Sequence, residues 1–279
     1  MTRQIASMLA LAMTLVAGRA AAQGPVYEVY AIRYATLSQF RVSGLVAGAD
    51  TSRRLDIAMM VWLLKGSDGR MVLVDAGFPP RDELMRRWRP VDYVSPNDAV
   101  AKAGVRADQI TDIVVSHIHW DHFAGAELFP NARVWIQREE IEHHVDSAGR
   151  VLDGAISRAD AEMLHRLRSA GRLQAVNGDA QEILPGITVY TGGKHTFQSQ
   201  YAGVRTTEGT VVLASDNLYL YENLDARVPI AATLDRASNL AAQSRMVSIA
   251  SDRRLIVPGH DPAVFDRFSV VAPGVVRVR

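Results

Sequence analysis

The chain of 279 residues contains no cysteine, and this absence excludes several kinds of chemistry. Disulfide bonds, thiolate metal sites and thiol nucleophiles all require cysteine, and so does lipid attachment to a cysteine at a mature amino terminus. Any metal ion must therefore be held by nitrogen or oxygen atoms of His, Asp or Glu side chains.

An excess of charge of one sign is also lacking, because 31 Lys and Arg residues are balanced by 30 Asp and Glu residues. The net charge of +1 creates no field that attracts a polyanion, so the composition argues against a nucleic-acid partner. Hydrophobic residues make up 48% of the chain and charged residues 22%, which is typical of a folded globular protein. No repeat, low-complexity segment or Pro/Gly/Ser-rich linker divides the sequence, and we expect one domain over residues 23–279.

A long apolar run occurs only at the amino terminus, where Arg3 precedes apolar residues from Ile5 to about Ala17. The small residues Ala20 to Ala22 follow, and this layout predicts a secretory signal peptide over residues 1–22. The run is shorter than the roughly 18 to 20 residues that a membrane span needs. We therefore expect a secreted or periplasmic protein without a stable membrane anchor.

Hydrophobic patterning predicts strands that occur in runs and are interrupted by helices. The expected strands are 26–35, 57–65, 70–75, 112–116, 134–136, 183–191, 210–215 and 254–257. The expected helices are 81–88, 97–103, 138–145, 156–170 and 234–250. Such an order is typical of an α/β domain with sheets inside and helices outside.

A dense histidine cluster, HIHWDH at residues 117–122, directly follows the predicted strand at 112–116. His117 and His119 alternate along an extended chain, so both imidazoles can point at one ion. Asp121 and His122 lie where the chain turns into a helix and can address a second ion beside the first. The cluster therefore predicts a metal site.

Three further metal-competent residues stand at predicted strand ends: His195 in GGKHT, Asp216 in ASDN and His260 in VPGHD. Each of them alone fits a hydrogen-bonded surface residue, which is the better interpretation of a single His, but together they supply the ligands that the cluster lacks. The remaining histidines lie in predicted helices without such companions, and we interpret them as solvent-exposed: His143, His144 and His165.

The motif HIHWDH, followed in order by the other three residues, resembles the metallo-β-lactamase-fold hydrolase superfamily over residues 26–265. The resemblance implies an αββα sandwich with a binuclear metal site at one edge. It implies a first metal held by His117, His119 and His195, a second held by Asp121, His122 and His260, and a bridging Asp216. Asp75 in VLVDAG matches an aspartate that supports the site in this superfamily without binding metal.

Within the superfamily, the spacing is similar to that of the N-acyl homoserine lactone lactonases and their pyridoxolactonase-like relatives. Asp216 lies 21 positions after His195, and His260 lies 44 positions after Asp216. These lactonases also carry a tyrosine three residues after the bridging aspartate, where this chain has Tyr219. One departure is the run GKHTFQ at 193–198, where many relatives show GHTPGH, so substrate contacts on that loop differ.

The resemblance predicts two divalent cations, with zinc favoured, although the nitrogen and oxygen ligands also suit iron, cobalt or manganese. We hypothesise that a metal-bridging hydroxide attacks the carbonyl carbon of a small-molecule lactone, such as an acyl homoserine lactone. Tyr219 would donate a hydrogen bond to the developing oxyanion, and Asp121 would carry a proton to the leaving alkoxide. A tyrosine that merely packs beneath the site is the alternative for Tyr219.

Two other functions fit the same residues. The predicted signal peptide favours a metallo-β-lactamase, whereas the carboxylate of Asp216 and the nearby Tyr219 favour a lactonase. A metal-binding protein without turnover is the third possibility, and the complete ligand set argues against it. Residues 38–50 and 146–160 are candidate pocket walls or simple surface loops, and nothing in the sequence indicates an oligomeric state.

Overall fold

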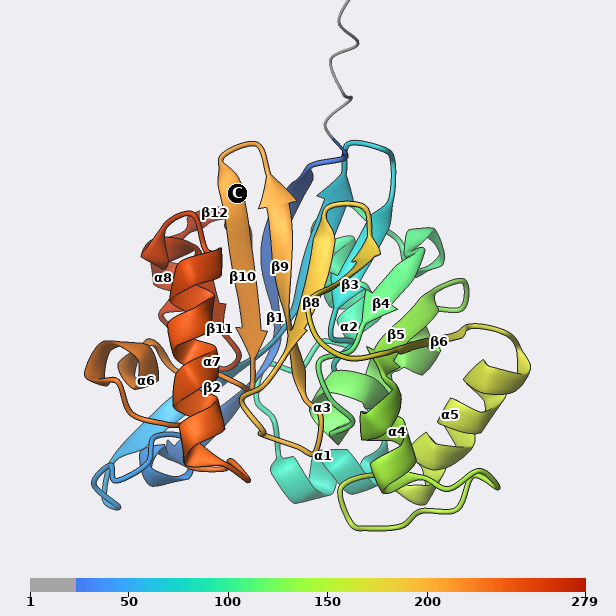
Figure 1. The fold of residues 1–279 in the computed structure, drawn as a ribbon, viewed down its shortest axis with the longest axis horizontal. Helices are drawn as coiled ribbons and strands as arrows, with labels where there is room; N and C mark the ends of the chain where they lie inside the picture. The colour runs from blue at the N-terminus through green and yellow to red at the C-terminus, as the bar shows by residue number, and fades with distance from the viewer. Residues whose placement is uncertain (1–23) are drawn as a thin grey trace, which may run out of the picture.

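The computed structural model describes residues 24–279, so the predicted signal peptide of residues 1–22 lies outside the described residues. Two β-sheets pack face to face, and helices cover their outer faces (Figure 1). The αββα sandwich predicted above is confirmed. Among residues 24–279 no helix is both long and apolar enough to cross a bilayer.

The larger sheet has eight strands, and its last four run parallel to one another. In spatial order they are β12 (Ser269–Ala272), β13 (Val275–Arg277), β1 (Tyr27–Arg41), β2 (Arg54–Gly66), β3 (Met71–Val74), β4 (Asp112–Val114), β5 (Arg133–Gln137) and β6 (Leu173–Val176). The smaller sheet contains β11 (Ile256–Pro258), β10 (Gly209–Ser215), β9 (Gln200–Thr206), β8 (Ile187–Thr191) and β7 (Gln181–Leu184). Only β10 and β11 are parallel in the smaller sheet.

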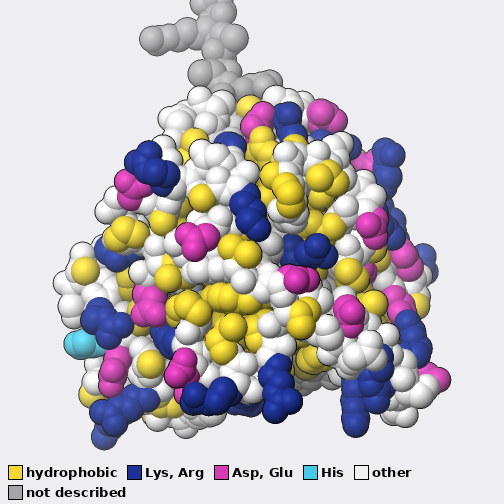
Figure 2. All heavy atoms as spheres, turned by 180° about the vertical axis from the view of Figure 1, so that it is seen from behind, with side chains coloured by type: hydrophobic (Ala, Val, Ile, Leu, Met, Phe, Trp, Pro, Cys, Tyr) yellow, Lys and Arg dark blue, Asp and Glu magenta, His cyan; other side chains and the backbone are white. Residues whose placement is uncertain are grey.

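The helices divide between the two outer faces. They are α1 (Asp82–Trp88), α2 (Pro96–Ala101), α3 (Trp120–Phe123), α4 (Arg138–His144), α5 (Arg158–Ser169), α6 (Tyr221–Ala226), α7 (Arg236–Ile249) and α8 (Val264–Arg267). Apolar side chains of α2, α4 and α5 pack on the larger sheet, and those of α7 pack on the smaller one. The face of the molecule that is hidden in Figure 1 is shown in Figure 2. Cationic and anionic side chains are interspersed on it, as expected from the balanced composition.

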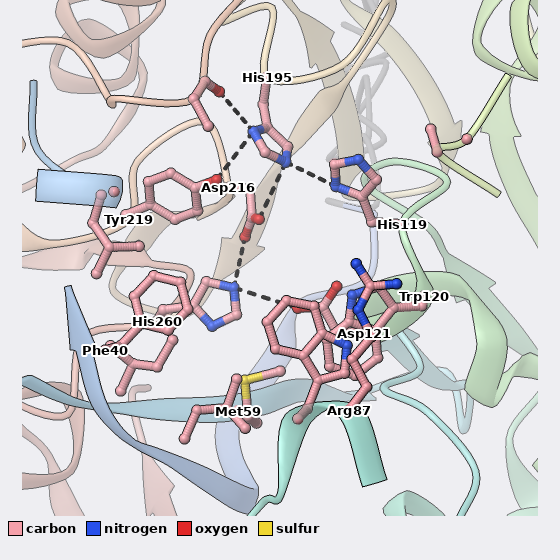
Figure 3. A pocket seen from close by; sticks show the side chains of 18 residues that line it. Phe40, Met59, Arg87, His119, Trp120, Asp121, His195, Asp216, Tyr219 and His260 are labelled. Atoms are coloured by element: carbon pink, nitrogen blue, oxygen red, sulfur yellow. Dashed lines mark hydrogen bonds and ion pairs between the residues drawn. The ribbon is translucent and has the colours of Figure 1, made fainter. Parts of the chain in front are cut away.

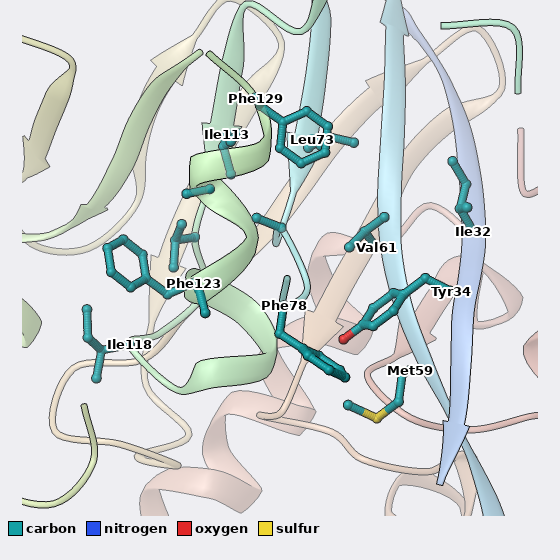
Figure 4. Close-up of a cluster of buried hydrophobic side chains, with 14 of the residues drawn as sticks. Ile32, Tyr34, Met59, Val61, Leu73, Phe78, Ile113, Ile118, Phe123 and Phe129 are labelled. Carbon is teal, nitrogen blue, oxygen red and sulfur yellow. The ribbon is translucent and has the colours of Figure 1, made fainter. Parts of the chain in front are cut away.

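Strand β2 shows why the core has separate layers. Its apolar run is buried on both faces, which is why the residues read as continuously hydrophobic rather than alternating. One face joins the layer beneath the helices, with Ile57, Met59, Val61 and Leu63. Met59 and Val61 are seen in this layer in Figure 4. The other fills the space between the sheets, with Ala58, Met60, Trp62 and Leu64. Each such large side chain contributes about 1.5 to 3 kcal/mol through its burial.

The expected element boundaries differ from the structure at several places. The single strand expected at 183–191 is wrong, because Pro185 and Gly186 turn the chain between β7 and β8, and Gly186 has a φ of 83°. Strand β1 continues to Arg41 through two register shifts, because β2 pairs with it along its polar end. The strands β6, β9, β12 and β13 and the helices α6 and α8 were not anticipated.

Candidate metal centre

The candidate site lies where parallel strands end, which is where side chains can project from a sheet edge. Strand β4 leads into the HIHWDH motif, and Asp216 and His260 follow the parallel strands β10 and β11. His195 lies on the loop between β8 and β9. The structure brings together all seven residues singled out from the sequence, in two groups whose ligand atoms lie within 4.8 Å of one another. Figure 3 shows the five of them that face the cavity: His119, Asp121, His195, Asp216 and His260.

In the first group three imidazole nitrogens converge. Nδ1 of His119 is 3.0 Å from Nε2 of His117 and 3.0 Å from Nε2 of His195. Oδ2 of Asp216 lies 3.3 Å from Nε2 of His195 and 3.8 Å from Nε2 of His117. Three histidines and a carboxylate facing one point form a donor set that suits a divalent metal ion.

In the second group the carboxylates of Asp121 and Asp216 face two histidines. Nε2 of His122 is 3.4 Å from Oδ2 of Asp121 and 3.3 Å from Oδ1 of Asp216. Nε2 of His260 is 3.0 Å from Oδ1 of Asp216. Asp216 therefore presents Oδ2 to the first group and Oδ1 to the second, which is the arrangement that a bridging ligand requires.

Among residues 24–279, two buried atoms at this centre have no hydrogen-bond partner: Nε2 of His122 and Oδ1 of Asp216. Leaving a buried polar atom unpaired costs about 1 to 3 kcal/mol, so both atoms are suited to an added cation. Protein groups already engage the opposite ring nitrogen, Nδ1, of four histidines. Those pairs are His117 with Ser116 Oγ, His122 with Asp75, His195 with the carbonyl of Ala232 and His260 with the carbonyl of Ala58. These contacts turn each Nε2 inward, and the residues fit a pair of metal ions.

The charges at the centre also suit cations. Burial lowers the pKa of His117 well below its usual value and that of His119 to about 4, so both present neutral lone pairs. Burial alone would raise the pKa of Asp216, but the positive charges of His122 and His260 outweigh burial and hold it well below its ordinary value. Asp216 is therefore ionised, and cations that bind here would displace protons from the two histidines.

Asp75 is fully buried and connects three of the loops that form the centre. Its carboxylate accepts hydrogen bonds from the backbone and hydroxyl of Ser116, from Nδ1 of His122 and from the hydroxyl of Ser215, at 2.7 to 3.0 Å. Asp75 and Ser215 both adopt left-handed backbone conformations, with φ of 57° and 48°, which is uncommon outside glycine. The network holds these conformations and orients His122.

Glu140 on α4 was missed in the sequence, although it is also fully buried. Its Oε1 accepts a hydrogen bond from the backbone N–H of Ile118 at 3.1 Å, and its Oε2 accepts one from Gln198 at 2.7 Å. One carboxylate thus joins the loop of His117 and His119 to the loop of His195. Glu140 stands beside exposed charged residues at the start of a helix, so no local pattern marks it as buried.

The interpretation of His144 as solvent-exposed is wrong. It is buried, its Nδ1 lies 2.7 Å from Oδ2 of Asp153, and its Nε2 lies 3.7 Å from Glu140. Asp153 lies outside α4, nine positions further along the chain, so the helical pattern of the sequence does not reveal this contact. His143 and His165 are exposed, as expected.

We expect Glu140→Gln to weaken metal binding about tenfold to a hundredfold, the range seen when an outer hydrogen-bond partner of a metal site is changed. The amide keeps only one acceptor, so its NH₂ group opposes one of the two backbone N–H groups. Competition with a chelating dye measures the affinity. The matched control is Glu139→Gln, at the exposed neighbouring position, and equal affinities in the two folded variants would contradict this role.

A cavity of about 380 Å³ opens onto the centre. Phe40, Tyr219 and His260 lie on one side of it, and Trp120 and Asp121 lie on the other (Figure 3). Residues from both candidate pocket segments line it, namely Phe40, Gly44 and Leu45 from 38–50 and Gly154 and Ala155 from 146–160. Its wall is mainly apolar, which suits an acyl chain or a ring.

Tyr219 is buried in this wall, and its hydroxyl lies 3.2 Å from Nδ1 of His195. That nitrogen donates its hydrogen to the carbonyl of Ala232 at 2.9 Å when Nε2 acts as a ligand. The hydrogen of the Tyr219 hydroxyl is then available to a molecule in the cavity. Burial raises the pKa of Tyr219 well above its ordinary value, and the negative charges of Asp216 and Asp121 raise it further. The hydroxyl therefore keeps its proton and remains a hydrogen-bond donor.

Comparison with known proteins places this geometry in a family. The model of the metallo-beta-lactamase superfamily matches residues 59–260. An N-acyl homoserine lactonase of Bacillus thuringiensis is 25% identical over 224 residues, which cover 74% of this chain and 82% of the relative. An N-acyl homoserine lactonase of Bacillus cereus is 24% identical over 222 residues, with the same coverage.

Solved structures show the same fold. A mutant of AiiA from B. thuringiensis, with N-decanoyl-L-homoserine at its active site, superposes with a TM-score of 0.71 and 22% identity, covering 90% of this chain and 99% of that one. The dizinc quorum-quenching lactonase AidC superposes with a TM-score of 0.61 and 15% identity. The superposition covers 91% of this chain and 97% of AidC. The chain therefore belongs to the metallo-beta-lactamase superfamily and is a metal-dependent hydrolase of that fold.

Proposed function

We propose that this hydrolase is a lactonase that opens N-acyl homoserine lactones or related cyclic esters. The observation that carries the proposal is the placement of Asp216, whose two oxygens face the two ligand groups, next to a cavity that contains the Tyr219 hydroxyl. The curated relatives named as N-acyl homoserine lactonases support the same substrate class.

Two divalent cations are proposed at the centre. The first would be held by His117, His119 and His195, the second by Asp121, His122 and His260, and both by Asp216. When bound, such ions polarise a carbonyl group and lower the pKa of water toward neutrality. Zinc suits these nitrogen and oxygen donors, as do iron, cobalt and manganese.

The side chains around the cavity complete the reaction. Water adds to the carbonyl carbon of the lactone, and the ring C–O bond then breaks. The Tyr219 hydroxyl donates a hydrogen bond to the oxyanion that forms, and apolar residues such as Phe40 and Met59 hold the acyl chain and exclude bulk water. Asp121, which borders the cavity, passes the proton of the attacking water to the leaving ring oxygen.

Replacing Tyr219 by Phe tests the oxyanion role. We expect kcat to fall about tenfold to a hundredfold while KM and metal content change little, because the lost hydrogen bond strengthens only as charge develops on the carbonyl oxygen. Steady-state kinetics on N-hexanoyl homoserine lactone and elemental analysis of the same sample measure both quantities. Unchanged kcat/KM would remove Tyr219 from the mechanism and leave the metal centre in place.

The substrate class is tested by incubating the metal-loaded protein with a panel of lactones of different ring and chain size and with a carbapenem. Opening of lactones and no turnover of the carbapenem is the expected result. Turnover of the carbapenem alone would favour a metallo-β-lactamase, and turnover of neither would show that this hydrolase acts on another class of substrate.

We also propose that residues 1–22 direct export to the periplasm or the medium, on the strength of the apolar run and the Ala20 to Ala22 segment alone. Expression of the full chain in a Gram-negative host, followed by amino-terminal sequencing of the periplasmic fraction, should give a mature protein that starts at Gln23. Recovery of the uncleaved chain from the cytoplasm would contradict export.

A further inference from the structure

We infer that Arg87 binds an anionic group on the substrate, so that the preferred lactones carry a carboxylate at the far end of their acyl chain. The inference rests on the proposed lactonase function and narrows its substrate class. Two observations support it: a second cavity lies next to the first, and the positive charge of Arg87 lies at the junction where the two cavities meet.

The second cavity has a volume of about 540 Å³ and lies beside the one that opens onto the metal centre. Both cavities are lined by Arg87, Trp88, Trp120, Gly154 and Ala155. The rings of Trp88 and Trp120 stack with their centroids 4.8 Å apart and their planes inclined by 13°. The acyl chain of a substrate that extends from the metal centre along Trp120 therefore contacts the apolar surface of the two indole rings and reaches Arg87.

Arg87 is the one charged residue lining the first cavity that is not in the candidate ligand set. Within residues 24–279 no carboxylate lies within ion-pair distance of it, and its guanidinium lies 5.2 Å from the ring centroid of Trp88. The other two arginines that line the second cavity are already paired, Arg81 with Asp160 at 2.6 Å and Arg158 with Glu162 at 3.0 Å.

The position of the anion follows from the other charges. Glu83 lies four positions before Arg87 on α1, and it lines the second cavity but not the first. Glu83 makes no ion pair with Arg87 among residues 24–279. Its negative charge nevertheless disfavours an anion inside the second cavity. An anion is therefore favoured at the junction and not deep in the second cavity. The planar guanidinium can donate two parallel hydrogen bonds to a carboxylate, and the adjacent indole surface suits the methylene groups before it.

Matched pairs of lactones test the inference: N-hexanoyl against N-adipoyl homoserine lactone, and N-octanoyl against N-suberoyl homoserine lactone. Within each pair the acyl chain has the same number of carbons, and only the second member ends in a carboxylate. We expect Arg87→Met to lower kcat/KM for at least one carboxylate-bearing lactone about tenfold, mainly through KM, and to change the neutral partners less than about twofold. Added salt should reduce the difference, because the guanidinium is exposed to solvent.

The matched control is Arg86→Met, because Arg86 is the preceding arginine on α1, is 75% exposed and lines neither cavity. Arg86→Met should leave all four lactones unaffected. If Arg87→Met lowers kcat/KM equally for neutral and anionic lactones, Arg87 has a structural role and the inference is overturned. The inference is also overturned if Arg87→Met lowers kcat/KM for neither carboxylate-bearing lactone.

Binding measurements separate this inference from the proposed function. Calorimetry with the ring-opened products N-hexanoyl-homoserine and N-adipoyl-homoserine, and with their eight-carbon counterparts, needs no turnover. If the wild-type protein opens no lactone but binds a carboxylate-bearing product more tightly in an Arg87-dependent way, the lactonase function fails and the anion site remains. If lactones are opened and no such preference exists, the anion site fails and the function remains.

Discussion

We expect Asp216→Ala to lower kcat/KM for a lactone by about three orders of magnitude and to remove most of the bound metal. Asp216 is the one residue whose carboxylate faces both ligand groups, with Oδ2 at 3.3 Å from His195 and Oδ1 at 3.0 Å from His260. The substitution therefore takes a ligand from each group at once. It also leaves the positive charges of His122 and His260 with less compensation in a buried site.

The measurement is metal content by elemental analysis after dialysis, together with steady-state kinetics on the same sample. Asp225→Ala is the matched control, because Asp225 lies on α6 with 61% of its side chain exposed and pairs only with Arg253. Full activity and unchanged metal content in Asp216→Ala would dismiss this residue from the centre. A loss of activity with full metal content would assign it a role other than ligation.

Asp75→Ala should destabilise the protein by about 3 to 5 kcal/mol, the cost typical of removing one partner of a buried charged network. Asp75 is fully buried and accepts hydrogen bonds from Ser116, His122 and Ser215. Removing its carboxylate leaves these donors without an acceptor, and His122 loses the contact that orients its ring. In a domain of this size we expect the melting temperature to fall by about 10 °C, and metal affinity to fall with it.

Thermal unfolding of the metal-free and metal-loaded protein measures this effect. Asp75→Asn, which retains one carbonyl oxygen as acceptor, should lie between the wild type and Asp75→Ala. Asp82→Ala is the surface control, since 90% of that side chain is exposed. A melting temperature for Asp75→Ala within about 1 °C of the wild type would show that the network does not hold the loops together.

Much of the fold was predictable because its buried strands have local signatures. The apolar runs around β2, β4 and β10 are long enough to mark strands buried on both faces, and the HIHWDH motif directly follows one of them. Four of the candidate ligands were found from that motif alone. The other three were found as a set, because each stands at a predicted strand end and together they supply the ligands that the motif lacks. The family resemblance then assigned each of them to a metal.

The residues that the sequence did not reveal depend on contacts between distant segments. Strand β13 exists because residues 275–277 pair with β1 at the other end of the chain, which no local pattern records. Glu140 is buried where the backbone N–H groups of Ile118 and Gln198, from two distant loops, donate to its carboxylate. Arg87 differs from its neighbour Arg86 in the cavities that it lines and in its lack of an ion pair among residues 24–279, and neither feature is visible in a sequence.

Titration of the metal-free wild-type protein with Zn²⁺, with hydrolysis of N-hexanoyl homoserine lactone measured at each point, tests the central claim most directly. If the two ligand groups joined by Asp216 each hold a cation and act together, lactone opening should rise to a plateau as about two equivalents bind. Hydrolysis that is independent of added metal, or protein that binds no zinc at these groups, would contradict the account.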